Sequence, residues 1–146
     1  MGMHTGAAAA VITLAAAAVP AVAPDMEPGR WEIVVEISAT TANPDREQNR
    51  DTRCYSAEDL AALPRSLAGS DAARGRDGCE THQFDLDARS ATWNLVCTRP
   101  QPLATSGELR FQGRSLIGQM RVTMQDASGR RSDLRTRITG RWLGPC

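Results

Sequence analysis

Residues 79–97, CETHQFDLDARSATWNLVC, decide the fold. Apolar and polar side chains alternate on both sides of the polar residues 87–90, with Phe84 before them and Trp93 after them. Alternation with a period of two is typical of a β-strand that has one apolar face. The polar residues between the two runs predict a tight turn. The stretch therefore predicts a β-hairpin in which Phe84 lies opposite Trp93.

Strands of the same kind are expected on both sides of this hairpin. Alternation, or a polar segment suited to pair with it, predicts them at residues 31–37, 47–54, 107–111, 116–124 and 134–142. Gly107, Gly118 and Gly140 inside these strands would let the sheet bend, or would merely loosen it. Six or seven strands with short connections predict a mainly β fold. We expect a single antiparallel curved sheet, a partly open barrel or a sandwich.

One short helix is expected between the second strand and the hairpin. Ser56 is a good N-cap, and Asp59 three residues later resembles the acid of a capping box. The helix should span residues 57–63 and end at Pro64, because a proline lacks the backbone N–H that the helix needs. Residues 66–78 are small, polar and arginine-bearing, which predicts a loop.

The N-terminal residues 1–23 have the pattern of a signal peptide. Residues 7–23 form an uncharged, alanine-rich run that is short for a membrane span, and Ala21 and Ala23 supply an A-x-A cleavage pattern. No lysine or arginine precedes the run, which departs from the usual signal-peptide pattern. The alternative is an uncleaved N-terminal anchor helix, which the length of the run disfavours. We expect residues 24–146 to form a single β-rich domain, periplasmic or secreted, with no stable membrane span in its mature form.

Four cysteines follow this leader, and none of them forms a C-x-x-C pair. An even number of widely spaced cysteines in an exported chain predicts two disulfides. Cys79 and Cys97 lie at the outer ends of the predicted hairpin, so we pair them with each other. Cys54 and Cys146 then remain as the second pair. A zinc site made from the four thiolates, or a redox-active pair, is a weaker alternative because the spacing suits neither.

The hairpin register and the first disulfide conflict by one residue. A hairpin with Phe84 opposite Trp93 pairs Glu80 with Cys97, one position away from the cysteine that should bond to it. A bulge near Gly78 would reconcile the two expectations, and a different hairpin register is the alternative.

The charged residues give little support for a nucleic-acid partner. The 17 arginines, with no lysine, balance 17 acidic residues and are dispersed among them. A nucleic-acid-binding domain usually has a net basic face. We therefore expect no nucleic acid among the partners, although arginines chosen for bidentate contacts to phosphate or carboxylate groups remain an alternative.

No catalytic, metal or cofactor motif stands out in the sequence. His82 is the one histidine after the leader, and it shares the expected inner face with Phe84. A hydrolase with His82 as general base is one interpretation, and a hydrogen-bonded histidine without a catalytic role is the other. Trp31, Trp93 and Phe111 would line a ligand cavity or simply pack in the core. Met120 and Met124 are expected to fill the core.

Four segments, taken in order, form a pattern that extends over nearly all of the chain after the leader. They are Pro28-Gly29-Arg30-Trp31, Cys54-Tyr55-Ser56-Ala57-Glu58-Asp59, Trp93 with Cys97, and Gly140-Arg141-Trp142-Leu143-Gly144-Pro145-Cys146. Together they resemble the bacterial family called domain of unknown function 3617. The resemblance implies an exported, β-rich protein with structural cysteines, and it implies no catalytic residue. The arginine-bearing residues 66–78 and the sparse methionines depart from the family pattern.

The leading functional hypothesis is a non-catalytic binding module. Its curved sheet would hold an apolar ligand, or a segment of an envelope partner, against Trp31, Trp93 and Phe111. A structural envelope protein that offers its strand edges to a partner is the alternative. A hydrolase using His82 is the third hypothesis.

Overall fold

The computed structural model describes residues 22–39, 46–69, 78–99 and 101–146, with the side chains of residues 81 and 82 excepted. It contains seven strands and one helix in this part of the chain. In chain order they are β1 (Gly29–Ala39), β2 (Arg46–Tyr55), α1 (Ala57–Leu67), β3 (Cys79–Leu86), β4 (Ser90–Cys97), β5 (Leu103–Phe111), β6 (Ser115–Gln125) and β7 (Arg131–Gly144). The leader, residues 1–21, lies outside the described residues.

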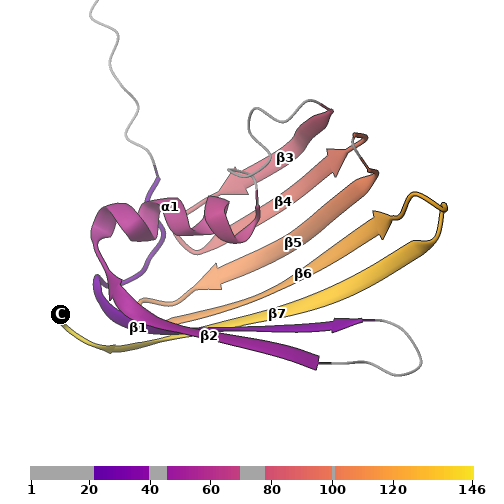
Figure 1. The fold of residues 1–146 in the computed structure, drawn as a ribbon. Helices are drawn as coiled ribbons and strands as arrows, with labels where there is room; N and C mark the ends of the chain where they lie inside the picture. Colours follow the sequence, from indigo (N-terminus) through magenta and orange to yellow (C-terminus); the bar gives the residue numbers. More distant parts are fainter. Residues whose placement is uncertain (1–21, 40–45, 70–77, 100) are drawn as a thin grey trace, which may run out of the picture.

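The seven strands form one antiparallel sheet in the order β2-β1-β7-β6-β5-β4-β3. β2 and β3 are the two edges, so the sheet is curved but not closed (Figure 1). The predicted single antiparallel curved sheet with one short helix is confirmed. The sandwich alternative does not apply, because a sandwich needs two sheets.

Helix α1 connects the two edges of the sheet and lies across one of its faces (Figure 1). The predicted cap is present, since Asp59 N–H donates to Ser56 Oγ and Ser56 N–H donates to the Asp59 carboxylate. The prediction that α1 ends at Pro64 is wrong, because the helix continues to Leu67. Pro64 is buried with Leu63, and its carbonyl accepts the N–H of Ala68 at 3.0 Å. Tertiary packing thus outweighs the missing N–H of the proline.

The strands other than β2 turn most of their apolar residues toward the face that α1 covers, which we call the inner face. Trp31 and Ile33 are buried there, whereas Glu32 between them points to the opposite, outer face. The core is a single cluster between α1 and the inner face. Its buried members are Met26, Trp31, Ile33, Tyr55, Leu60, Leu63, Ala68, Ala91, Trp93, Leu109, Phe111, Leu116 and Ile138.

The conflict between hairpin register and disulfide is resolved by a shift in β3. Phe84 lies opposite Trp93 and Cys79 lies opposite Cys97, as both expectations required. The register shifts between Thr81 and Gln83, and not near Gly78, where we expected the bulge. One extra residue in β3 shifts the pairing by one position. Phe84 can therefore lie opposite Trp93 while Cys79 lies opposite Cys97.

Gly107 is required by the close approach of a ring, and not by bending alone. A Cβ at this position would lie 2.5 Å from Cζ2 of Trp93 and 2.6 Å from the carbonyl oxygen of Gln119. No side chain fits at these distances, so the glycine lets the indole of β4 lie flat over β5.

Candidate functional site

The inner face has two halves that differ in cover. At one end of the strands α1 closes over the aromatic core, and we call this end the covered half. At the other end apolar side chains stay half-buried or exposed and lie outside the core cluster, and we call this end the open half. The open half consists of Ile37, Leu103, Val122, Met124 and Leu134.

The three aromatics predicted to line a ligand cavity lie in the covered half. Trp31 is fully buried, and Phe111 and Trp93 are 2% and 4% exposed. Trp31 Nε1–H donates to the carbonyl oxygen of Glu27 at 2.8 Å, which fixes the indole. None of the three lines the two pockets found among the described residues. Their position is that of core residues, and a ligand contact to them stays a prediction.

Two buried polar atoms mark the boundary between the halves. Trp93 Nε1 and Thr105 Oγ1 have no hydrogen-bond partner within the described part of the chain. Trp93 lies opposite Gly107, two residues along β5 from Thr105. An unpartnered buried donor or acceptor costs about 1–3 kcal/mol. In the described part of the chain, the buried side-chain atoms that lack a hydrogen-bond partner therefore lie next to the open half.

The open half is a continuous apolar surface across four strands. Val122 lies opposite Leu134 on one side and opposite Thr105 on the other, and Leu103 lies opposite Met124. Met124 is 38% exposed, so the expectation that it fills the core is wrong, whereas Met120 packs against the core cluster. A pocket of about 390 Å³ adjoins Leu103 and Met124 at the end of the sheet.

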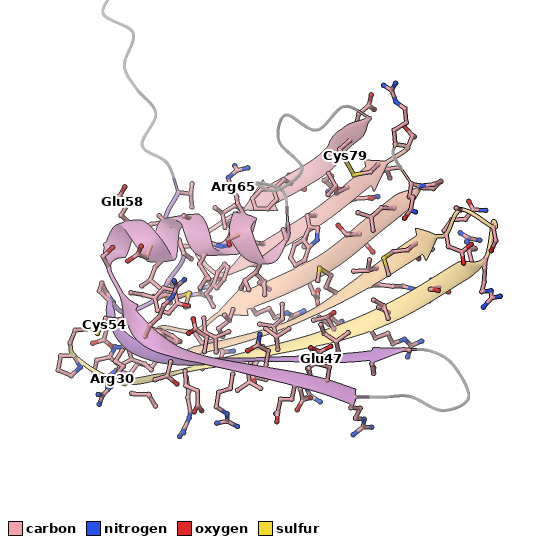
Figure 2. The ribbon with its side chains drawn as sticks, viewed as in Figure 1. Arg30, Glu47, Cys54, Glu58, Arg65 and Cys79 are labelled. Carbon is pink, nitrogen blue, oxygen red and sulfur yellow. A yellow bond between two sulfur atoms is a disulfide. The ribbon has the colours of Figure 1, made fainter. Side chains whose placement is uncertain are left out.

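Both predicted disulfides are present, one at each end of the sheet (Figure 2). Cys54–Cys146 ties the end of β2 to the C-terminus beside the covered half, with Cα atoms 6.0 Å apart. Cys79–Cys97 joins β3 to β4 at the open half, with Cα atoms 3.9 Å apart. All four sulfur atoms are used in these bonds, which leaves no thiolate as a zinc ligand.

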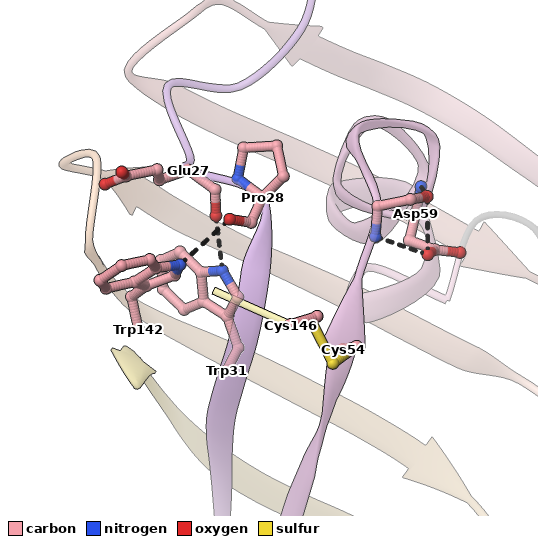
Figure 3. The surroundings of a disulfide bond; sticks show 8 residues. Glu27, Pro28, Trp31, Cys54, Asp59, Trp142 and Cys146 are labelled. Carbon is pink, nitrogen blue, oxygen red and sulfur yellow. Dashed lines mark hydrogen bonds between the residues drawn. A yellow bond between two sulfur atoms is a disulfide. The ribbon is translucent and has the colours of Figure 1, made fainter. Parts of the chain in front are cut away.

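Trp142 and its neighbours contact the segment before β1, beside the Cys54–Cys146 disulfide (Figure 3). Trp142 Nε1–H donates to the carbonyl oxygen of Pro28 at 3.2 Å. The guanidinium of Arg114 lies 4.4 Å from the Trp142 ring and pairs with Glu27. The hydrogen bond from Arg114 lowers the pKa of Glu27. These contacts hold the segment before β1 and are structural.

Acidic and basic side chains on the outer face pair closely near the covered half. Glu32 accepts from Arg141 at 2.8 Å and from Arg50 at 2.7 Å. The hydrogen bond from Arg141, followed by that from Arg50, lowers the pKa of Glu32 below its ordinary value of 4.5. Glu32 therefore carries its charge throughout the neutral pH range.

A second hollow, on the outer face, was not predicted from the sequence. It has a volume of about 1060 Å³ and lies over the middle of β5, β6 and β7. We call it the outer groove. Arginines dispersed along the sequence line it, including Arg110, Arg121 and Arg137. Period-two alternation places them on one face, but only the order of the strands brings them together.

The remaining candidate residue, His82, lies where the register of β3 shifts. Its side chain is outside the described residues, so the hydrolase hypothesis gains no geometry. In the described ranges no group of three or more histidine, cysteine, aspartate or glutamate side chains is placed to hold a metal ion. No helix of those ranges is long and apolar enough to cross a membrane.

Comparison with curated proteins and with solved structures finds no match. A family model does match, over residues 26–146, and its description is "Protein of unknown function (DUF3617)". The match includes every described strand, the helix and all four cysteines. The chain therefore belongs to the DUF3617 family.

Proposed function

We propose that this protein is a non-catalytic binding module of the bacterial envelope, and that the open half of its inner face holds an apolar ligand. The observation that carries the proposal is the apolar surface formed by Ile37, Leu103, Val122, Met124 and Leu134 next to a core that α1 has closed. Burying such side chains stabilises a complex by about 25 cal/mol per Å² of apolar area. Two disulfides support an exported chain, because such bonds persist in oxidising compartments.

The occupant that suits this surface is a flexible aliphatic chain. Its residues are aliphatic side chains and a methionine, which adapt to a ligand without a fixed shape. A folded partner protein would instead need a wider contact, of about 800 Å² on each side.

The strand edges give less support to the structural alternative. The edge strand β2 is exposed and polar along its length up to Tyr55, and β3 contains the register shift. Charged edge residues and bulges are the features by which sheets avoid pairing with other chains.

The test uses N-phenyl-1-naphthylamine, an uncharged apolar dye whose fluorescence rises in an apolar site. We expect the purified protein to bind the dye and the variant Val122→Ser to bind it about tenfold more weakly, because one side of the surface is lost. Ile117→Ser is the matched control, since Ile117 is an exposed residue of the same strand on the outer face. Equal binding by both variants, or no binding by the unmodified protein, would rule out the open half as the site.

A further inference from the structure

The outer groove lies on the opposite face of the sheet from the open half, so it stands apart from the function proposed above. The side chains that line it come from outward-facing positions such as Ser106, Glu108 and Gln119. Residues at inward-facing positions, among them Ile37 and Met120, also border it, and a Cβ at Gly107 or Gly118 would point to the inner face. With a volume of about 1060 Å³, the groove is far larger than a single inorganic anion needs.

Positive charge is concentrated in this groove although the whole chain is neutral. Five arginines line it against two glutamates. Arg121 lies directly opposite Arg135 in the β6–β7 ladder. Like charges directly opposite each other destabilise a sheet, so this pair costs stability unless an anion lies between or above the two guanidinium groups.

The groove arginines have few acidic partners in the described part of the chain. Arg121 approaches Asp133 at 3.9 Å, and no ion pair is formed there by Arg110, Arg135 or Arg137. By contrast, Arg50 and Arg141, which lie outside the groove, both form ion pairs with Glu32 at hydrogen-bonding distance.

The two acids of the groove offset only part of its positive charge, with Glu36 placed opposite Arg137 in the β1–β7 ladder. Glu108 accepts from the amide of Gln119 at 3.3 Å, and Glu36 accepts from the amide of Gln48 at 3.3 Å. Both carboxylates are thus engaged by neutral donors. The guanidinium groups of the groove remain available to carboxylate or phosphate groups of a ligand, which they bind in a bidentate manner.

We propose that the outer groove binds an anionic glycan, a chain of sugars that carries carboxylate or phosphate groups. Arg110, Arg121 and Arg135 stand on three successive strands, and neighbouring strands are about 4.8 Å apart. Arg121 and Arg135 form one adjacent pair, and Arg110 lies four residues along β5 from Ser106, the residue opposite Arg121. The cationic groups are thus spread along the groove, as a chain of several acidic sugars requires. Between them Ser106, Thr92 and Gln119 offer hydrogen-bonding groups that suit sugar hydroxyls.

Other anionic partners fit the groove less well. Its described lining contains no aromatic side chain, on which the bases of single-stranded nucleic acid would stack. An acidic peptide would find the sheet backbone already paired within β5, β6 and β7. A flat membrane would not fill a hollow.

The experiment is calorimetric titration with a hexasaccharide of galacturonic acid. We expect the unmodified protein to bind it and to ignore maltohexaose, its uncharged counterpart. The double variant Arg121→Gln/Arg135→Gln should weaken binding at least about tenfold, which is the loss expected when two charge-assisted contacts disappear. Arg89→Gln/Arg99→Gln removes the same charge from exposed positions outside the groove and should bind like the unmodified protein.

Several outcomes would overturn the proposal. They are equal losses in both double variants, and tighter binding of inorganic phosphate, polyglutamate, single-stranded DNA or phosphatidylglycerol vesicles than of the acidic hexasaccharide. NMR signals of the arginine Nε–H groups give a second readout that needs no variant. The hexasaccharide should shift those of Arg110, Arg121 and Arg135, and unchanged signals would refute the site. Binding of N-phenyl-1-naphthylamine should be the same in the unmodified protein and in both double variants, which separates this proposal from the one above.

Discussion

The covered and open halves of the inner face have the same sequence pattern and different burial. Along β6 the inward-facing residues run from Leu116, which is fully buried, through the half-buried Met120 to Met124, which is 38% exposed. Trp31 and Ile37 differ in the same way along β1. All of these residues occupy equivalent positions of an alternating strand. The difference comes from α1, which covers one end of the strands and leaves the other end open.

Each half also has its own covalent link. Cys54–Cys146 closes a chain separation of 92 residues next to the helix, and Cys79–Cys97 closes one of 18 residues at the open half. The short link fixes two neighbouring strands in a region that α1 does not cover. The long link fixes the C-terminus to the strand that leads into α1.

The largest expected loss of stability comes from removing the disulfide beside the covered half. In the chain-entropy model, Cys54→Ser/Cys146→Ser should lower the free energy of unfolding by about 4.6 kcal/mol, and Cys79→Ser/Cys97→Ser by about 3.2 kcal/mol. Urea denaturation of both double variants measures these losses. The reverse order would show that the open half depends more on its covalent link than the covered half does.

Loss of a covered side chain should cost more than loss of an open one. We expect Trp31→Ala to lower the free energy of unfolding by about 3–5 kcal/mol, because it leaves a cavity in the core. Ile37→Ala on the same strand and face should cost less than about 2 kcal/mol, because Ile37 is only half-buried and folding removes less of its apolar area from water. Similar costs in urea denaturation would contradict the distinction between the two halves.

The smallest expected effect is on the response to acid. The pKa of Glu32 near the covered half is lowered by Arg141 and Arg50, and that of Asp126 near the open half is lowered by Ser128 and the backbone N–H of Arg130. The carboxyl groups of the unfolded chain take up protons first as the pH falls. The stabilisation is therefore complete above the ordinary pKa values of 4.5 and 3.8 and is lost as the pH falls through the lowered native pKa values.

Thermal unfolding between pH 7 and pH 2.5 measures this effect. Glu32→Gln should flatten the decline in melting temperature that begins just below pH 4.5, and Asp126→Asn the decline that begins just below pH 3.8. An unchanged profile for Glu32→Gln would mean that its two arginine contacts do not persist in solution.

The predictions that succeeded depend on local patterns, and those that failed depend on packing. Ser56 and Asp59 correctly predicted the start of α1, because the capping box depends on two residues three positions apart in the sequence. Pro64 did not end it, because burial of Leu63 and Pro64 favours the longer helix. Residue counting left a bulge near Gly78 and a different hairpin register as alternatives, and only the structure shows the shift between Thr81 and Gln83.

The candidate sites followed the same division. Trp31, Trp93 and Phe111 were correctly placed on the inner face, but alternation does not reveal which part of a face a distant helix covers. The outer groove was invisible in the sequence, since Arg110 and Arg135 are separated by the whole of β6 along the chain.

The sequence by itself determined the strands, the two faces of each strand and the cysteine pairs, because these follow from spacing along one chain. Tertiary structure alone decided which half of the inner face is closed and which arginines share a groove. Both depend on how α1 and neighbouring strands meet in space, and no period within a single segment contains that information.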